Sequence, residues 1–330
     1  MIRVAGTYQG RRCGPPAHVQ REARDVPTVH SFALSDGRSV CIRQWPGRGR
    51  PLVLLHGLLD SGAGWDDLAR ALPYPCLAVD LPGFGGSDPP RRPRFSAYAE
   101  AIVEALRQLE VSACTVVGHS LGGGVATAVT EQMSDQVHAL VLCAPAGYGR
   151  IPLAELAALP IVRALAVSSL PHLVTRSRRL DSVYGAFVTS GLLPSEELRR
   201  RLAADAWRLG PGLEAAIEAL AVAGRSPRAF YRRGVAYDGP VTAVWGDRDA
   251  LVPPGHVRGV IAALPQATVH RWPGMGHHPQ RERPAALAAL VRSAHRAGRG
   301  EQAFRRHATA RPRSAQDARR RDHSRPHSRL

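Results

Sequence analysis

The chain has 330 residues, enough for one large α/β domain with an insertion or for two ordinary domains. Hydrophobic residues make up 44% and charged residues 22%, which is typical of globular proteins and excludes a wholly disordered or collagen-like chain. The net charge is +17, and every basic residue is arginine. Because lysine also binds phosphate well, we attribute the arginine excess to a GC-rich coding bias and expect no main role in nucleic-acid binding.

The cysteines give no indication of a disulfide framework. The five cysteines are an odd number and include no C-x-x-C pair: Cys13, Cys41, Cys76, Cys114 and Cys143. Three of them, Cys76, Cys114 and Cys143, lie in apolar, strand-like runs. Such residues usually behave as small buried hydrophobes, so we expect a reducing, cytoplasmic compartment. The most apolar long stretch, 151–174, contains charges and three prolines, and we expect no transmembrane segment.

The predicted elements begin after an arginine-rich arm, residues 1–28, which we expect to be flexible. Strands over 29–34 and 39–44 follow, joined at an Asp-Gly pair typical of a hairpin. Short apolar runs then alternate with helical patterns: strands over 52–55, 76–79, 113–117 and 139–143, and helices over 65–72, 95–109 and 121–132. This alternation requires crossover connections, so it predicts an α/β fold with a mostly parallel, doubly wound sheet.

The alternation stops at residue 145 and resumes at residue 239. The interval shows only helical patterns and loops, most clearly a helix over 195–209, and later strands over 241–245 and 268–272 come with helices over 255–264 and 283–295. We therefore expect a core of 29–144 and 239–295 and an inserted helical cap of 145–238. Residues 296–330 are rich in arginine and poor in branched aliphatics, which predicts a disordered tail. We interpret this tail as an unselected extension, the alternative being an electrostatic tether to an acidic partner.

The strongest indication of chemistry is Gly118-His119-Ser120-Leu121-Gly122, a G-x-S-x-G motif between a predicted strand and a predicted helix. In this context the motif predicts a nucleophile elbow, a turn so tight that its flanking positions have no room for side chains. The alternative is a glycine-rich packing turn without chemistry. An elbow would raise the hydroxyl of Ser120 above the sheet at the start of a helix.

A serine hydroxyl needs a base to take its proton, and the base needs an acid to orient it. In this architecture the acid and then the histidine follow the serine along the chain. Asp249 follows the strand over 241–245, and His277 follows the strand over 268–272, so we favour these two. Asp247 and His278 are their rivals.

The oxyanion hole requires two backbone N–H groups, which we assign to Leu121 and Leu58. His56 and Gly57 precede Leu58 in its loop, and because His56 comes before the serine in the chain we expect it to brace the loop. The glycine-rich stretch 80–88 lacks G-x-G-x-x-G spacing, and no metal-ligand motif occurs, so we expect neither cofactor nor metal.

With these residues placed, the chain resembles the α/β-hydrolase superfamily over about residues 29–295, in its capped branch of serine esterases and meta-cleavage-product hydrolases. The resemblance rests on five motifs: His56-Gly57, Asp80-Leu81-Pro82-Gly83-Phe84-Gly85-Gly86-Ser87, the G-x-S-x-G run with Gly123, Gly246-Asp247-Arg248-Asp249 with Pro253, and Gly276-His277 with Pro279. It implies Ser120 as nucleophile, His277 as base, Asp249 as orienting acid, and Leu58 and Leu121 as oxyanion donors. Related dehalogenases and epoxide hydrolases carry aspartate where this chain has Ser120.

These patterns predict a serine hydrolase that cleaves an ester-like acyl bond of a small apolar or amphipathic substrate through an acyl-enzyme. The alternatives are an acyltransferase or a C–C bond hydrolase with the same triad, or a non-catalytic binding protein on this fold. Carbon–carbon hydrolases of the superfamily often carry asparagine where His119 stands, which weakens that alternative. The sequence does not indicate the oligomeric state.

Overall fold

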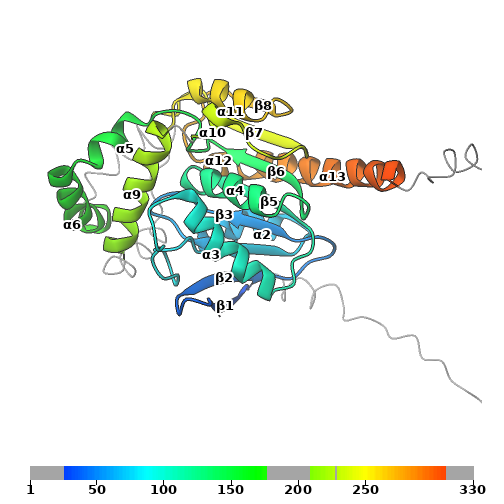
Figure 1. Cartoon of the computed structure of the whole chain (residues 1–330), viewed down its shortest axis with the longest axis horizontal. Helices are drawn as coiled ribbons and strands as arrows, with labels where there is room; N and C mark the ends of the chain where they lie inside the picture. Colours follow the sequence, from blue (N-terminus) through cyan, green and yellow to red (C-terminus); the bar gives the residue numbers. More distant parts are fainter. Residues whose placement is uncertain (1–25, 177–208, 227–228, 310–330) are drawn as a thin grey trace, which may run out of the picture.

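The computed structural model describes residues 26–176, 209–226 and 229–309. An eight-stranded sheet of order β1-β2-β4-β3-β5-β6-β7-β8 forms its centre (Figure 1). The hairpin of β1 and β2 joins β4 antiparallel, and all other neighbours are parallel. The strands are β1 (Thr28–Ala33), β2 (Ser39–Trp45), β3 (Leu52–Leu55), β4 (Cys76–Val79), β5 (Cys114–His119), β6 (Val137–Cys143), β7 (Val241–Gly246) and β8 (Thr268–Trp272). The predicted fold class is therefore confirmed.

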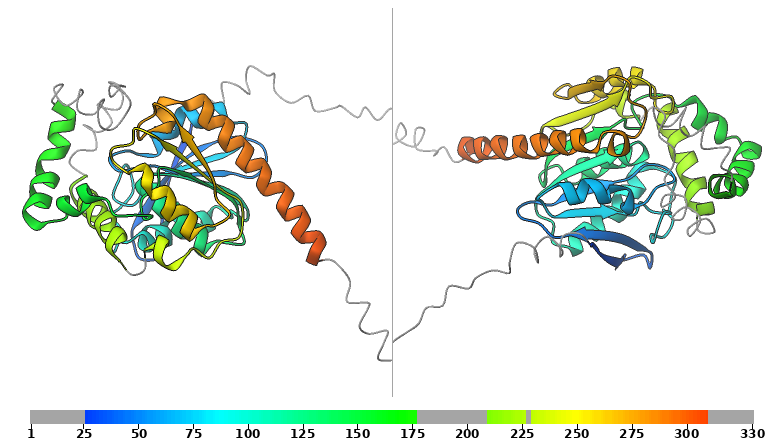
Figure 2. Two further views of the ribbon diagram at one scale, coloured as in Figure 1. Left: turned by 90° about the horizontal axis from the view of Figure 1, so that it is seen from above. Right: turned by 180° about the vertical axis from the view of Figure 1, so that it is seen from behind.

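Helices cover both faces of the sheet. On the face of Val53 and Leu55 lie α3 (Phe95–Gln108), α4 (Leu121–Gln132) and α11 (Val257–Ala263). On the opposite face, that of Leu52 and Leu54, lie α2 (Asp66–Ala71) and α13 (Pro284–Thr309), as Figure 2 shows for α13. Since successive side chains of a strand point to opposite faces, a strand covered on both sides must be apolar throughout, as β3 is. Short helices η1 (Gly62–Trp65), η2 (Pro254–His256) and α12 (Pro279–Glu282) lie in the loops.

Four helices of the described part lie between β6 and β7; the first three form a separate layer beyond one end of the sheet, and the last packs against α11 (Figure 1). They are α5 (Pro152–Ala157), α6 (Pro160–Arg176), α9 (Leu209–Arg225) and α10 (Phe230–Arg233). We call the first three the cap helices. The helix expected over 195–209 lies outside the described residues, apart from Leu209, which begins α9.

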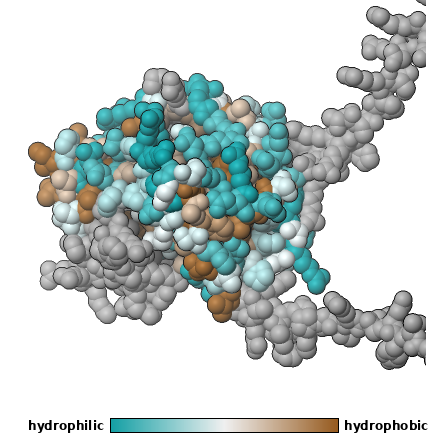
Figure 3. All heavy atoms as spheres, turned by 60° about the horizontal axis from the view of Figure 1, so that its bottom comes forward, coloured by the Kyte–Doolittle hydropathy of each residue, from teal (hydrophilic) through white to brown (hydrophobic). Residues whose placement is uncertain are grey.

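The cap helix α9 packs directly on the core. A Cβ atom added to Gly212 would lie 1.8 Å from the carbonyl oxygen of Gly83, so the helix backbone touches the loop after β4 directly. By contrast, α5, α6 and their connection carry large apolar side chains at the surface (Figure 3, left edge), namely Leu153, Leu156, Leu159, Ile161 and Leu165. Among the cap helices, α9 is thus fixed against the core, whereas α5 and α6 expose an apolar surface.

The C-terminal helix is longer than expected. We expected it to end at residue 295 with disorder beyond, but α13 continues to Thr309 and extends past the body of the fold (Figure 1). The first part of the expected tail, 296–309, thus belongs to α13. A lack of branched aliphatics argues against burial but not against a helix, because Ala, Arg, Gln and Glu all favour helix and no proline occurs between Pro284 and Pro312. The rest of the predicted tail, 310–330, and most of the predicted arm, 1–25, lie outside the described residues.

Candidate active site

The G-x-S-x-G segment forms a strained turn between β5 and α4. Ser120 has φ 54° and ψ −118°, a conformation that costs an L-residue energy and that the surrounding structure must enforce. Its N–H donates to Cys143 O at 3.0 Å, and its carbonyl oxygen accepts from Ala146 N–H at 2.9 Å. The turn is held from the neighbouring strand end, as a nucleophile elbow requires.

The glycines of this turn are needed for close approach. A Cβ atom at Gly118 would lie 2.3 Å from the carbonyl oxygen of Gly122. A Cβ atom at Gly122 would lie 2.3 Å from the carbonyl oxygens of both Leu55 and His56. Because these obstacles are backbone atoms that cannot rotate away, a side chain at Gly118 would distort the first turn of α4, and one at Gly122 would force the elbow away from β3.

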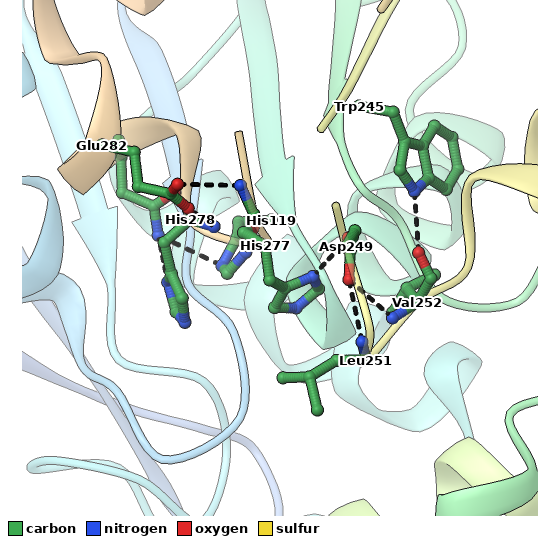
Figure 4. Close-up of polar contacts among 10 residues, drawn as sticks. His119, Trp245, Asp249, Leu251, Val252, His277, His278 and Glu282 are labelled. Atoms are coloured by element: carbon green, nitrogen blue, oxygen red, sulfur yellow. Dashed lines mark hydrogen bonds and ion pairs between the residues drawn. The ribbon is translucent and has the colours of Figure 1, made fainter. Parts of the chain in front are cut away.

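The loops after β7 and β8 bring Asp249 and His277 together. His277 Nδ1–H donates to Asp249 Oδ2 at 2.7 Å, and both side chains are buried (Figure 4). The other carboxylate oxygen, Oδ1, accepts from the backbone N–H groups of Leu251 and Val252, each at 2.9 Å. Asp249 is thereby fixed with one oxygen for the loop and one for the imidazole.

The two rival residues have other partners. Asp247 accepts from the backbone N–H of Gly274 at 2.7 Å. The Nδ1 of His278 accepts from the side-chain amide of Gln280 at 3.2 Å, and burial lowers the pKa of His278 well below its usual value. Of the four candidates, His277 and Asp249 are the two that share a hydrogen bond.

The loop after β3 passes over the elbow. A Cβ atom at Gly57 would lie 3.3 Å from Ser120 Cβ and 2.8 Å from the imidazole of His119, so this loop needs glycine to come close. Leu58 follows in the same loop, and Leu121 begins α4 directly after Ser120. The structure therefore brings the two segments expected to supply oxyanion donors to the same side chain.

His56 joins this loop to the loop after β4. Its Nδ1–H donates to Gly57 O at 2.7 Å, and its Nε2 accepts from Leu81 N–H at 2.9 Å. Burial lowers the pKa of His56, so the ring is neutral, with one donor and one acceptor as these partners require. The glycine-rich stretch after β4 is tied in by Asp80, whose carboxylate accepts from Gly62 and Gly86 N–H at 2.7 and 2.9 Å.

Sequence reasoning missed two polar residues beside His277. Gln280 donates to the Nδ1 atoms of His119 and His278, each at 3.2 Å. Glu282 accepts from the backbone N–H of Gly276 at 2.8 Å and of His278 at 2.9 Å (Figure 4). The only hint in the sequence is that both lie within five positions of the predicted base, because hydrogen-bond direction leaves no mark in a hydrophobicity pattern.

Two further properties concern the described residues alone. Among them, no group of three or more His, Cys, Asp or Glu side chains is placed to hold a metal ion. The helices of the described part include none that is both long and apolar enough to cross a bilayer.

Comparison with known proteins places this geometry in a family. The sequence model of the α/β hydrolase fold family matches residues 50–284. An uncharacterised protein of Mycobacterium tuberculosis is 30% identical over 287 residues, which cover 82% of each chain. The chain therefore belongs to the α/β hydrolase family.

Relatives with stated activities include an acyltransferase and an esterase. The dihydrolipoyllysine-residue acetyltransferase component of the acetoin cleaving system of Cupriavidus necator is 27% identical over 277 residues, 81% of this chain and 69% of the relative. A crystal structure of an esterase from Rhodococcus sp. superposes with a TM-score of 0.63 at 25% identity, covering 80% of this chain and 97% of the esterase. Fold and relatives together support a hydrolase or an acyltransferase-like activity.

Proposed function

We propose that this protein is a serine hydrolase that cleaves an ester-like acyl bond of a small apolar or amphipathic molecule. The observation that carries the proposal is the buried hydrogen bond from His277 to Asp249, at the sheet edge where Ser120 stands in a strained turn. Binding alone requires neither the strain nor a buried histidine–carboxylate pair. Both serve nucleophilic catalysis by a Ser-His-Asp triad on this fold, in which the turn presents the serine and the pair supplies its base.

In the proposed mechanism His277 acts first as a base. In a neutral imidazole whose Nδ1–H is donated to Asp249, Nε2 carries no proton and can accept the hydroxyl proton of Ser120. The serine oxygen attacks the carbonyl carbon, and the backbone N–H groups of Leu58 and Leu121 hold the resulting oxyanion. His277 then returns the proton to the leaving alcohol, which leaves an acyl group on Ser120. Water, deprotonated by His277, attacks this acyl-enzyme and releases the acid.

The chemistry of the substrate is inferred from the cap helices. Leu213 and Ala216 of α9 are buried where this helix meets the core, so the layer that faces the sheet is apolar there. A pocket under such a layer favours an apolar acyl or alcohol group. Efficient hydrolysis of small charged esters alone would contradict this assignment.

Acyl transfer is the second candidate function, because the relative from Cupriavidus necator is an acetyltransferase component. The same acyl-enzyme would then pass its acyl group to an alcohol, amine or thiol in place of water. Adding such an acceptor during ester turnover separates the two: a hydrolase forms the free acid, whereas a transferase forms the acylated acceptor.

The test is labelling with a fluorophosphonate probe, together with turnover of chromogenic esters from acetyl to dodecanoyl. We expect wild type to be labelled, Ser120→Ala to lose both labelling and turnover, and Ser96→Ala, a change at an exposed serine of α3, to keep both. The chain length turned over fastest would give the size of the pocket. A folded wild type that neither reacts with the probe nor hydrolyses any ester would overturn the proposal.

A further inference from the structure

We propose that His119 is a positioning residue that holds the loop of the catalytic base against the nucleophile elbow, and that Gln280 selects the imidazole tautomer that does so. This inference rests on the proposed function, because it concerns how Ser120 and His277 are brought into register. His119 itself transfers no proton in it.

The hydrogen bond that carries the inference joins two distant parts of the chain. His119 is the last residue of β5, directly before Ser120, and its side chain is fully buried. Its Nε2 lies 2.8 Å from the carbonyl oxygen of His277, and the two imidazole rings are 4.7 Å apart between centroids. The main chain of the proposed base is thus bonded to the neighbour of the proposed nucleophile.

The tautomer of His119 follows from its two partners. A carbonyl oxygen can only accept, so Nε2 must carry a proton to bond His277. Burial lowers the pKa of His119 well below its usual value, so the ring is neutral and its Nδ1 is an acceptor. The Nε2–H of Gln280 supplies the matching donor at 3.2 Å. With Gln280 donating, the alternative tautomer would set two donors against each other.

Glu282 binds the same loop at two further points. Its carboxylate accepts the N–H groups of Gly276 and His278, on either side of the carbonyl that His119 binds. Side chains therefore bind the main chain of three consecutive residues, 276–278. Asp249 in addition binds the imidazole of the middle residue, His277. If the bond from His119 to the carbonyl oxygen of His277 is lost, the loop keeps its bonds to Glu282, but its main chain is no longer bonded to the elbow. A displacement of about 1 Å between reacting groups can lower a rate by about a hundredfold.

Two substitutions at one position separate this role from simple packing. In His119→Gln the amide nitrogen reaches about as far as the ring Nε2 and can still donate to His277 O. In His119→Asn it reaches only as far as Nδ1, which keeps a partner for Gln280 but leaves the carbonyl unbound. We expect His119→Gln to keep kcat within about threefold of wild type, and His119→Asn to lose roughly tenfold to a hundredfold in kcat with KM nearly unchanged.

The matched control is His295→Asn. His295 is likewise a buried histidine, whose Nδ1 is hydrogen-bonded to Thr115 Oγ1 at 2.9 Å, but Thr115 lies near the start of β5 whereas Ser120 follows its end. The two ends are separated by about 16 Å of strand. We expect this variant to melt at a lower temperature than wild type but to keep its kcat.

The readouts are kcat, KM, the rate of fluorophosphonate labelling and the melting temperature. Equal kcat in His119→Asn and wild type would overturn the proposal, and so would equally low kcat in His119→Asn and His119→Gln. Should His119→Asn fail to fold, Gln280→Leu decides: we expect a loss of about threefold to tenfold in kcat at constant KM, and an unchanged kcat would overturn the proposal. An inactive, folded wild type would instead overturn the proposed function, and this inference with it.

Discussion

Replacing Asp249 with asparagine changes the proton arrangement of the candidate site while keeping its shape. The native carboxylate divides its two oxygens between different donors. Oδ1 accepts from Leu251 and Val252 N–H, each at 2.9 Å, and Oδ2 accepts from His277 Nδ1–H at 2.7 Å. An asparagine keeps both loop bonds only if its carbonyl oxygen takes the place of Oδ1. Its NH₂ group then faces His277 and donates to Nδ1, which moves the imidazole proton to Nε2 and leaves no base for Ser120.

The cost of the opposite amide orientation sets the size of the effect. With the NH₂ group turned toward the loop, the N–H groups of half-buried Leu251 and buried Val252 would both lack an acceptor. Each unsatisfied group costs about 1–3 kcal/mol, so the productive orientation is disfavoured by about 2–6 kcal/mol. At about 1.4 kcal/mol per factor of ten, kcat should fall by roughly 30-fold to 20,000-fold.

Ester turnover and thermal melting measure this prediction. We expect Asp249→Asn to melt close to wild type, to lose kcat as stated and to keep KM. The control is Asp247→Asn, because Asp247 accepts from Gly274 N–H in the same loop region without contacting His277, and its kcat should stay within about twofold of wild type. An Asp249→Asn variant with a tenth or more of the wild-type kcat would refute the reasoning, as would an equal loss in Asp247→Asn.

Two further predictions concern the cap helices. Gly212→Ala should destabilise the protein by about 1–3 kcal/mol and raise KM, because the added Cβ would lie 1.8 Å from Gly83 O. The control is Gly255→Ala: nothing lies within 4 Å of the added Cβ, so the free energy of unfolding should change by less than about 0.5 kcal/mol. Equal melting temperatures for the two variants would contradict direct contact between α9 and the core. Hydrogen bonds from Arg150, and to a smaller extent from Arg225, lower the pKa of the Glu155 carboxyl to about 2. The stability that this carboxylate contributes is therefore present above pH 4.5 and is lost as the pH falls toward 2. Glu155→Gln should therefore melt below wild type at neutral pH with a difference that shrinks in acid, and a difference that stays constant with pH would exclude this linkage.

The sequence predicted the bounds of three strands, two of them buried on both faces. The strands β3, β4 and β8 have the bounds that their apolar or β-branched runs predicted. β6 begins at Val137, two residues before the predicted start, because His138 interrupts the apolar run although it is buried. The end of α13 was missed for a related reason, since its last residues form a helix from local propensity without the apolar pattern that marks a buried one.

In the candidate site, too, some contacts could be predicted from the sequence and others could not. The contact between Asp249 and His277 could be anticipated because a parallel sheet gathers its carboxyl-end loops at one edge, and the order of motifs along the chain says which loops meet there. The bond from His119 to His277 could not be anticipated, although it joins two of the same loops. Periodicity reports which face of an element is buried, whereas a hydrogen bond depends on where one atom points and on which nitrogen holds a proton. Here that proton is fixed by a third residue, Gln280, so the alignment of the proposed base depends on an amide that no motif includes. In a site of this kind the motif residues specify the chemistry, and the buried polar residues between them determine whether the reacting atoms meet.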